Sequence, residues 1–447
     1  MDTREKLNNI ITVVGENFYG ERKPVELIFA SLLSEENIML YGQKGTGKTT
    51  LAINVISALY SFPTKFVGEA TLQGSVTNPT TLFAAPKLDK LREEGEYEYV
   101  LRKTPFVFAG RLIDEVNRGD SGTQNILIPM LDERREYVVN GMPIGSALDA
   151  YIGTVNVNGT GTYQISEQLA DRFGVWIFLM PRYISNINLK DNKREQLEDI
   201  LGSGEDEELC NRFLNAVEDG KLGEVRKKMK ELRKEYAEKY NTISPDELNE
   251  IKHQINSIRK QLSSEIEKAL FPVVYTSIYF TNANSHETGA KPYLGYVDLK
   301  NTSKRPEITI KKLIPSLIYL RGYDINNISE KEIESIVWEL LPHVIAREIS
   351  ITQNGLDFLK QKYENEEISG RIYNSEEGKK WFMAKHVMDS LRRDYNRERD
   401  VLLNQLNQIM EQMRRNPNVQ IDTRDMHIVI KEIVRDLQRW GAWIQKN

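Results

Sequence analysis

The spacing of hydrophobic residues changes near Pro181 and divides the chain into two kinds of sequence. Between about residues 10 and 182, short apolar runs alternate with segments of helical periodicity. The apolar runs that we interpret as strands are 38–41, 65–68, 110–113, 150–155 and 175–179. Strands that alternate with helices are typical of a parallel sheet covered by helices. This half of the chain therefore predicts an α/β fold.

After Pro181 the pattern becomes one of charged helices, with apolar residues three or four positions apart. Two stripes are clear, one formed by Leu222, Val225, Met229, Leu232 and Tyr236, and the other by Leu248, Ile251, Ile255, Ile258 and Leu262. The stripes fit an antiparallel hairpin, a coiled coil for a partner or ordinary packing inside a domain, and we favour ordinary packing. Further helices are expected at 307–363, 376–415 and 423–444, after a loop or hairpin at 282–302.

Composition narrows the class of protein without identifying it. The 447 residues, 40% of them hydrophobic and 28% charged, can form two or three domains with their own cores. The net charge of −5 argues against nucleic acid as a partner. Cys210 is the single cysteine, and no apolar run approaches the roughly 18 to 20 residues of a membrane span. Because the N-terminus also lacks a signal-peptide pattern, we expect a cytoplasmic protein.

The strongest motif fits G-x-x-x-x-G-K-[ST] and lies between a predicted strand and a predicted helix. Glycines at such a turn let backbone N–H groups surround a β-phosphate, and a lysine reaches the β/γ oxygens. We assign that lysine as Lys48, and we assign Thr49 as a ligand of Mg²⁺. The motif alone does not distinguish ATP from GTP. The predicted nucleotide-binding residues are Gly42, Gln43, Lys44, Gly45, Thr46, Gly47, Lys48, Thr49 and Thr50.

Two adjacent acids, Asp114 and Glu115, follow the apolar run at 110–113. At the carboxyl end of a strand, both can reach the nucleotide crevice of a parallel sheet. Asp114 would orient Mg²⁺ through its water shell, and Glu115 would polarise the attacking water. This division of roles indicates hydrolysis and argues against a small-molecule kinase.

Together these motifs resemble the MoxR group of AAA+ ATPases over about residues 10–350. The segments that carry the resemblance, besides the phosphate loop, are Val14-Gly15, 24–33, 96–100, 104–108, Asp114-Glu115-Val116-Asn117-Arg118, 124–134, 153–156, 161–163 and 171–173. The resemblance implies an α/β P-loop AAA+ core, followed by an all-helical lid and a helical C-terminal extension. The expected boundaries are 1–185 for the core, 186–350 for the lid with an inserted segment at about 204–241, and 351–447 for the extension.

The resemblance also implies three residue roles. Asn156, or failing that Asn158, would sense the γ-phosphate. Arg172 would act in trans as an arginine finger on the nucleotide of a neighbouring subunit. Arg305 would contact the phosphates from the lid, although Lys304 stands where the family has proline, so either cation could point inward.

The implied function is hydrolysis of ATP with Mg²⁺ by a homo-oligomeric ring, expected to be a hexamer, that remodels or assembles a protein partner. The resemblance suggests a partner with a von Willebrand factor A-type domain. The segment 71–101 and a hairpin at 137–143 would face the pore of the ring. Two alternatives stay open: a nucleic-acid motor like McrB or MCM, and a nucleotide-gated scaffold with little turnover.

Overall fold

The computed structural model contains two compact units. The first unit comprises Met1–Gln261 and Pro315–Ile325, and the second comprises Leu262–Ile314 and Asn326–Asn447. The structure describes residues 2–18, 22–74, 84–86, 99–101, 109, 111–132, 136–139, 142–145, 150–157, 161–179, 207–218, 222–282, 295–299, 305–363 and 376–415.

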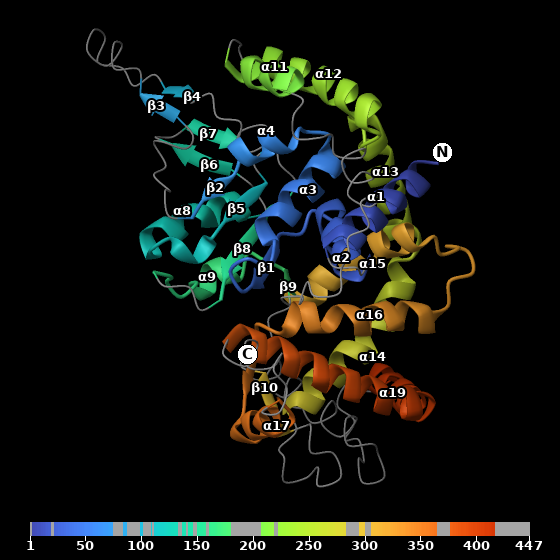
Figure 1. The fold of residues 1–447 in the computed structure, drawn as a ribbon. Helices are drawn as coiled ribbons and strands as arrows, with labels where there is room; N and C mark the ends of the chain where they lie inside the picture. The colour runs from blue at the N-terminus through green and yellow to red at the C-terminus, as the bar shows by residue number, and fades with distance from the viewer. Residues whose placement is uncertain are drawn as a thin grey trace. The chain divides into compact units, whose positions relative to one another are not determined.

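A parallel sheet of five strands, in the order β2-β5-β8-β1-β9, forms the centre of the first unit (Figure 1). Its strands are β2 (Leu72–Gln73), β5 (Leu112–Asp114), β8 (Ile152–Asn156), β1 (Ile38–Gly42) and β9 (Val175–Phe178). Every residue of β1, β8 and β9 is buried. Strands that are buried on both faces read as largely apolar runs, as β1 and β9 do, which is why the sequence reveals them.

The register brings the predicted motifs to one edge of this sheet. Gly42 pairs with Asn156 across β1 and β8, and Ile113 pairs with Gly153 across β5 and β8. Parallel strands end at the same edge, so the phosphate loop after β1 and the acids after β5 become neighbours. Asn156, the last residue of β8, lies beside them.

Helices α1 (Thr3–Phe18), α2 (Arg22–Leu33) and α3 (Lys48–Tyr60) pack against one another, and α2 and α3 also pack on the sheet. Of the residues in α3, ten of thirteen are buried. The helix that begins at the phosphate loop is therefore fixed within the core, and it holds Lys48 and Thr49 at the edge of the sheet.

One predicted strand is wrong. Residues 65–68 lie in a helix, α4 (Thr64–Glu69), and the edge strand β2 begins only at Leu72. The apolar run there is only Phe66 and Val67, both buried, and two adjacent apolar residues cannot separate strand from helix periodicity. Pro63 at the N-cap fixes the backbone just before the helix, where a proline is well tolerated.

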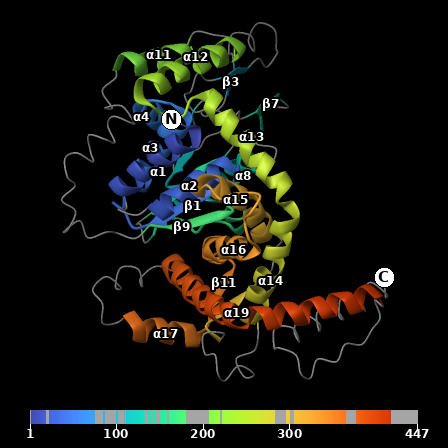
Figure 2. The ribbon, with the colours of Figure 1, turned by 90° about the vertical axis from the view of Figure 1, so that its right-hand side faces the viewer.

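The first unit also contains α8 (Ser121–Leu131), α9 (Glu167–Ala170), α11 (Glu207–Glu218), α12 (Leu222–Tyr240) and α13 (Pro245–Gln261). Both predicted stripes are buried wherever their side chains are described. α11 and α12 lie side by side (Figures 1 and 2). Phe213 of α11 packs on Phe62 and Phe66, and Arg233 of α12 donates a hydrogen bond from Nε to the Tyr60 carbonyl oxygen at 2.6 Å. Within the segment 204–241, α11 and α12 thus pack on α4 and on the end of α3.

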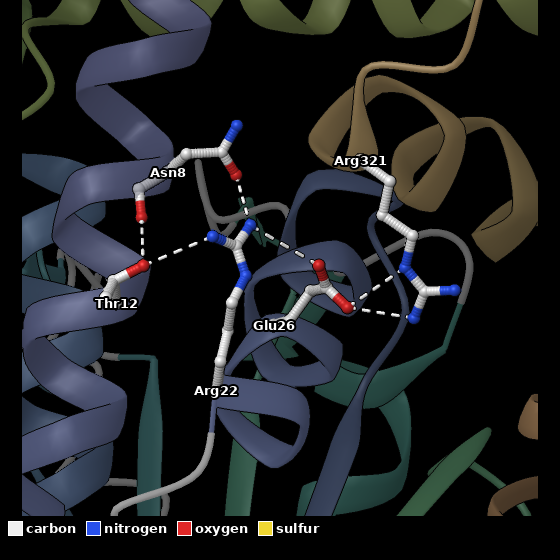
Figure 3. Close-up of polar contacts among 5 residues, drawn as sticks. All are labelled: Asn8, Thr12, Arg22, Glu26 and Arg321. Atoms are coloured by element: carbon white, nitrogen blue, oxygen red, sulfur yellow. Dashed lines mark hydrogen bonds and ion pairs between the residues drawn. The ribbon is translucent and has the colours of Figure 1, made fainter.

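A buried carboxylate joins α1, α2 and the end of α15 (Arg305–Arg321) within this unit (Figure 3). Glu26 Oε2 accepts hydrogen bonds from Arg321 Nη2 at 2.8 Å and Nε at 3.1 Å, and Oε1 accepts one from Arg22 Nη2 at 3.4 Å. Arg22 also bonds Asn8 and Thr12 of α1. Every charge in this cluster has a partner of opposite sign.

The second unit is mostly helical, as the periodicity predicts. It contains α14 (Ser263–Asn282), the first ten residues of α15, α16 (Glu330–Ile345), α17 (Gln353–Tyr363) and α19 (Glu376–Arg415), with a two-stranded ribbon of β10 (Val297–Leu299) and β11 (Ile349–Ile351). α16 packs on α14 and on α19. Ser329 and Glu332 form a capping box at the start of α16. The helix expected at 423–444 lies outside the described residues.

Two short hairpins complete the described strands. β6 (Glu136–Val139) pairs with β7 (Met142–Gly145), as the Asn-Gly turn predicts, and β3 (Ala84–Pro86) pairs with β4 (Tyr99–Leu101) within the segment 71–101. None of the described helices combines the length and the apolar character needed to cross a lipid bilayer.

Candidate active site at the carboxyl edge of the sheet

The phosphate loop has the backbone that its glycines predict. Gly47, the N-cap of α3, has φ 77°, in the left-handed region that residues with a Cβ rarely adopt. Lys48 folds back into the loop, where its Nζ donates to Gln43 O at 2.7 Å, Gly42 O at 3.0 Å and Thr46 Oγ1 at 3.3 Å. Each of the three acceptors is uncharged, so the ammonium group satisfies its donors without forming an ion pair.

Burial lowers the pKa of Lys48 from 10.5 to about 8, and the nearby carboxylates of Asp114 and Glu115 counteract part of this effect. The side chain is 5% exposed. A cation taken out of water without a carboxylate in contact is destabilised in its charged form. A desolvated ammonium group of this kind favours the binding of an anion.

Asp114 is fixed by hydroxyl groups on two elements. Thr49 Oγ1 donates to Asp114 Oδ1 at 2.7 Å, and Thr154 Oγ1 donates to the same oxygen at 2.5 Å. The two residues predicted to hold Mg²⁺, Thr49 as a ligand and Asp114 through the water shell, are therefore in contact. Thr154 had no predicted role, although it lies two residues before Asn156 on β8 and so faces the same side of that strand.

Glu115 lies just past β5 in an unusual backbone conformation, with φ 50°. Its Oε1 accepts a hydrogen bond from Asn156 Nδ2 at 2.6 Å, and its Oε2 forms an ion pair with Arg118 Nε at 2.7 Å. Thr154 Oγ1 accepts the backbone N–H of Glu115 at 2.9 Å. The predicted base and the predicted sensor are thus in direct contact.

Asn117 supports Asn156 from the short helix η1 (Val116–Arg118). Its Nδ2 donates to Asn156 O at 2.9 Å, and its carbonyl oxygen accepts the N–H of Tyr163 at 2.6 Å. Asn117 and Arg118 belong to the Asp-Glu motif, but no role was predicted for either residue. Their role depends on which way η1 turns, which sequence periodicity does not predict.

Arg172 is not part of this cluster in its own chain. Its carbonyl oxygen accepts a hydrogen bond from Asn37 Nδ2 at 2.8 Å, and Asn37 immediately precedes β1. Arg172 therefore lies at the amino edge of the sheet, and four steps of about 3.3 Å along β1 separate that edge from Gly42. Its side chain, 25% exposed, is 3.4 Å from Asp132.

The remaining predicted site residues make no described contact with this cluster or lie outside the described chain. Thr50 and Lys44 are exposed, on α3 and on the loop before it. Arg305 is half-buried at the start of α15 in the second unit. Lys304 and Asn158 lie outside the described residues. The roles assigned to all of these residues stay predictions.

The strand order and the edge cluster define a nucleotide-binding α/β protein of the P-loop class. Residues 37–173 match the family described as AAA domain (dynein-related subfamily). Among solved structures, the chain is similar to a candidate ATPase from Cytophaga hutchinsonii, at 16% identity and a TM-score of 0.50, over 88% of this chain and 94% of that one. A full-length MCM homologue from Methanopyrus kandleri matches at 11% identity and a TM-score of 0.41, over 78% of this chain and 61% of that one.

No curated protein matches the chain at a significant level. The match at residues 37–173 and the strand order show that this part of the chain is an AAA domain, as the resemblance to the MoxR group led us to expect. The predicted fold class, a P-loop core followed by a helical region, is confirmed.

Proposed function

We propose that the protein hydrolyses ATP with Mg²⁺ and uses the energy, as a ring of identical subunits, to remodel or assemble a protein partner. The observation that carries this proposal is the convergence of Lys48, the Thr49–Asp114 pair and the Glu115–Asn156 pair at one sheet edge. These groups supply, respectively, a cation for the phosphates, oxygen ligands for a metal ion and a base next to an amide.

The donor set fits Mg²⁺ and a triphosphate. Hydroxyl and carboxylate oxygens are the ligands that Mg²⁺ prefers, and Thr49 Oγ1 and Asp114 Oδ1 are already 2.7 Å apart. When bound, Mg²⁺ would offset the negative charge of the phosphate oxygens. The left-handed turn at Gly47 leads directly into the N-terminus of α3, where backbone N–H groups favour an anion.

Glu115 is the group that we assign as general base. A water molecule would attack the γ-phosphorus while its proton passes to the Glu115 carboxylate. The bond to the β–γ bridging oxygen would break, which leaves ADP and inorganic phosphate. Asn156 could hold the base and the γ-phosphate together, because one amide carries both donors and an acceptor.

The position of Arg172 supports an assembly in which each site is completed by a neighbour. Because the backbone of Arg172 lies at the sheet edge opposite Lys48 and its side chain pairs with Asp132, a role in hydrolysis requires a second subunit. We extend this to a ring, which the family resemblance suggests is a hexamer. The protein partner, its von Willebrand factor A-type domain, a cytoplasmic location and the lid role of Arg305 are proposals from the same resemblance.

A two-variant experiment tests this function. Glu115→Gln should keep ATP affinity and lose about 10²- to 10⁴-fold in the rate of hydrolysis, the usual contribution of a general base. Arg172→Ala should bind ATP and be similarly slow. Mixing the two variants should restore part of the ATPase rate, because sites form that combine an intact Glu115 with an intact Arg172.

Two controls separate the alternatives. Full turnover by Glu115→Gln would place the base elsewhere, and no recovery in the mixture would rule out action in trans. Stimulation of the wild-type ATPase by DNA, but not by protein partners captured with Glu115→Gln and ATP, would favour a nucleic-acid motor. Normal ATP-driven assembly with negligible turnover in the wild type would favour the scaffold.

A further inference from the structure

The conformation of Glu115 depends on two residues to which the sequence assigned no role, Gly74 and Arg118. Glu115 has a left-handed backbone although it carries a side chain, which is a strained conformation for a non-glycine residue. Such strain persists only where the surroundings hold the residue in place. The described contacts show what holds it.

Gly74 holds the backbone. Its N–H donates to Asp114 O at 2.8 Å, directly before the strained residue. A Cβ added at Gly74 would overlap the Glu115 carbonyl oxygen, and this contact would be with backbone rather than with a movable side chain. The main chain can turn at Glu115 only because position 74 lacks a side chain.

Arg118 holds the carboxylate. Its Nε is 2.7 Å from Oε2, whereas Asn156 Nδ2 is 2.6 Å from Oε1, so each oxygen has a donor on a different element. A carboxylate that is gripped at both oxygens has little freedom to rotate, and each oxygen keeps a further lone pair for a water molecule. A charge-assisted bond from a guanidinium is short and directional.

We propose that Arg118 is a positioning residue, which sets the orientation of the Glu115 carboxylate for proton transfer, and that Gly74 permits the backbone turn this orientation requires. The inference rests on the proposed function, since it assigns no role to Arg118 apart from Glu115. Stability is not the main role of the pair, because the Arg118 side chain is 41% exposed and exposed ion pairs contribute little to it.

The test is steady-state ATP hydrolysis by Arg118→Met. We expect kcat to fall about 10- to 100-fold, the range that a small misplacement of a reacting group produces, while KM changes less than twofold. Arg118→Lys, which keeps a cation without the planar fork, should recover part of the loss. Gly74→Ala should lower kcat as well, with ATP binding used to confirm that the variant is folded.

A double variant distinguishes positioning from an independent role. If Arg118 acts through Glu115, adding Arg118→Met to Glu115→Gln should not lower the residual rate further, and multiplied losses would overturn the proposal. Arg212→Met is the matched control: Arg212 is 46% exposed and pairs with Glu235, and its loss should leave kcat unchanged.

The outcomes separate this inference from the proposed function. An unchanged kcat in Arg118→Met, together with an inactive Glu115→Gln, would refute only the role of Arg118. Normal hydrolysis by Glu115→Gln would refute the function on which both rest.

Discussion

Two clusters of charged side chains in this protein differ in whether their charges are matched. At the edge of the sheet, the buried Lys48 ammonium bonds only uncharged oxygens, and its pKa is lowered to about 8. Between α16 and α19 in the second unit, Arg399 donates from Nε and Nη2 to the two carboxylate oxygens of Glu334, at 2.7 and 2.8 Å. Tyr395 Oη donates to Glu334 Oε1 at 3.0 Å.

This difference distinguishes a binding site from a contact that only holds two helices together. In the α16–α19 cluster the buried guanidinium has a carboxylate in contact, and burial together with the adjacent Glu334 carboxylate raises the pKa of Tyr395, which keeps that hydroxyl a donor. At the sheet edge, a cation is desolvated without a counterion in contact. A protein gains nothing in stability from such a group, so the arrangement indicates binding of an anion.

The largest effect on stability should come from the α16–α19 cluster. Glu334→Ala would leave the Arg399 guanidinium buried without its main counterion, and breaking a buried pair destabilises by about 3–5 kcal/mol. The loss should appear as faster hydrogen exchange in α16 and α19. ATP affinity should stay within twofold of the wild type.

Glu330→Gln is the control for this prediction. Glu330 accepts a hydrogen bond from the same guanidinium at 3.2 Å but is 43% exposed, so its loss should change stability by about 1 kcal/mol or less. Equal effects of the two variants would mean that burial does not distinguish these carboxylates.

Lys48→Met should show the reverse behaviour. ATP affinity should fall about 10²- to 10³-fold, which corresponds to about 3–4 kcal/mol, because the triphosphate loses its buried cation. Stability should change little, since relief of the desolvated charge offsets the three lost hydrogen bonds. Isothermal titration with ATP and a thermal melt of the free chain measure both effects. A large fall in melting temperature with affinity retained would make Lys48 a structural residue.

The residues explain why the sequence predicted one cluster better than the other. Lys48, Thr49, Asp114 and Glu115 are fixed by local motifs, each a few residues long, and parallel pairing then brings the strand ends together. The partners Thr154 and Gly74 come from neighbouring strands, so their contacts depend on register. Glu334 and Arg399 are 65 residues apart, on two amphipathic helices whose relative rotation the periodicity does not determine.

The strand prediction at 65–68 was wrong for a similar reason, since the hydrophobic pattern there did not determine the structure. Phe66 and Val67 are buried, as an apolar run predicts, but burial is common to helices and strands. The core at β1, β8 and β9 was predictable because its runs are longer and begin or end at motifs with a defined backbone geometry.

The smallest predicted effect follows from the pKa of Lys48. Its value of about 8 lies below the ordinary 10.5, so the free chain loses this proton as pH rises through 8, whereas bound phosphate oxygens would favour the charged form. ATP binding should therefore take up a proton above pH 8, and affinity should weaken up to about tenfold per pH unit there. Below pH 8 this dependence should vanish. Titrations in buffers of different ionisation enthalpy measure the proton uptake directly.

Lys48→Arg provides the control, because a guanidinium stays charged across this pH range, and ATP binding by this variant should show no such slope. A wild-type affinity that is flat between pH 7 and 9.5 would mean that the ammonium remains protonated, and the contrast with the matched α16–α19 cluster would then rest on geometry alone.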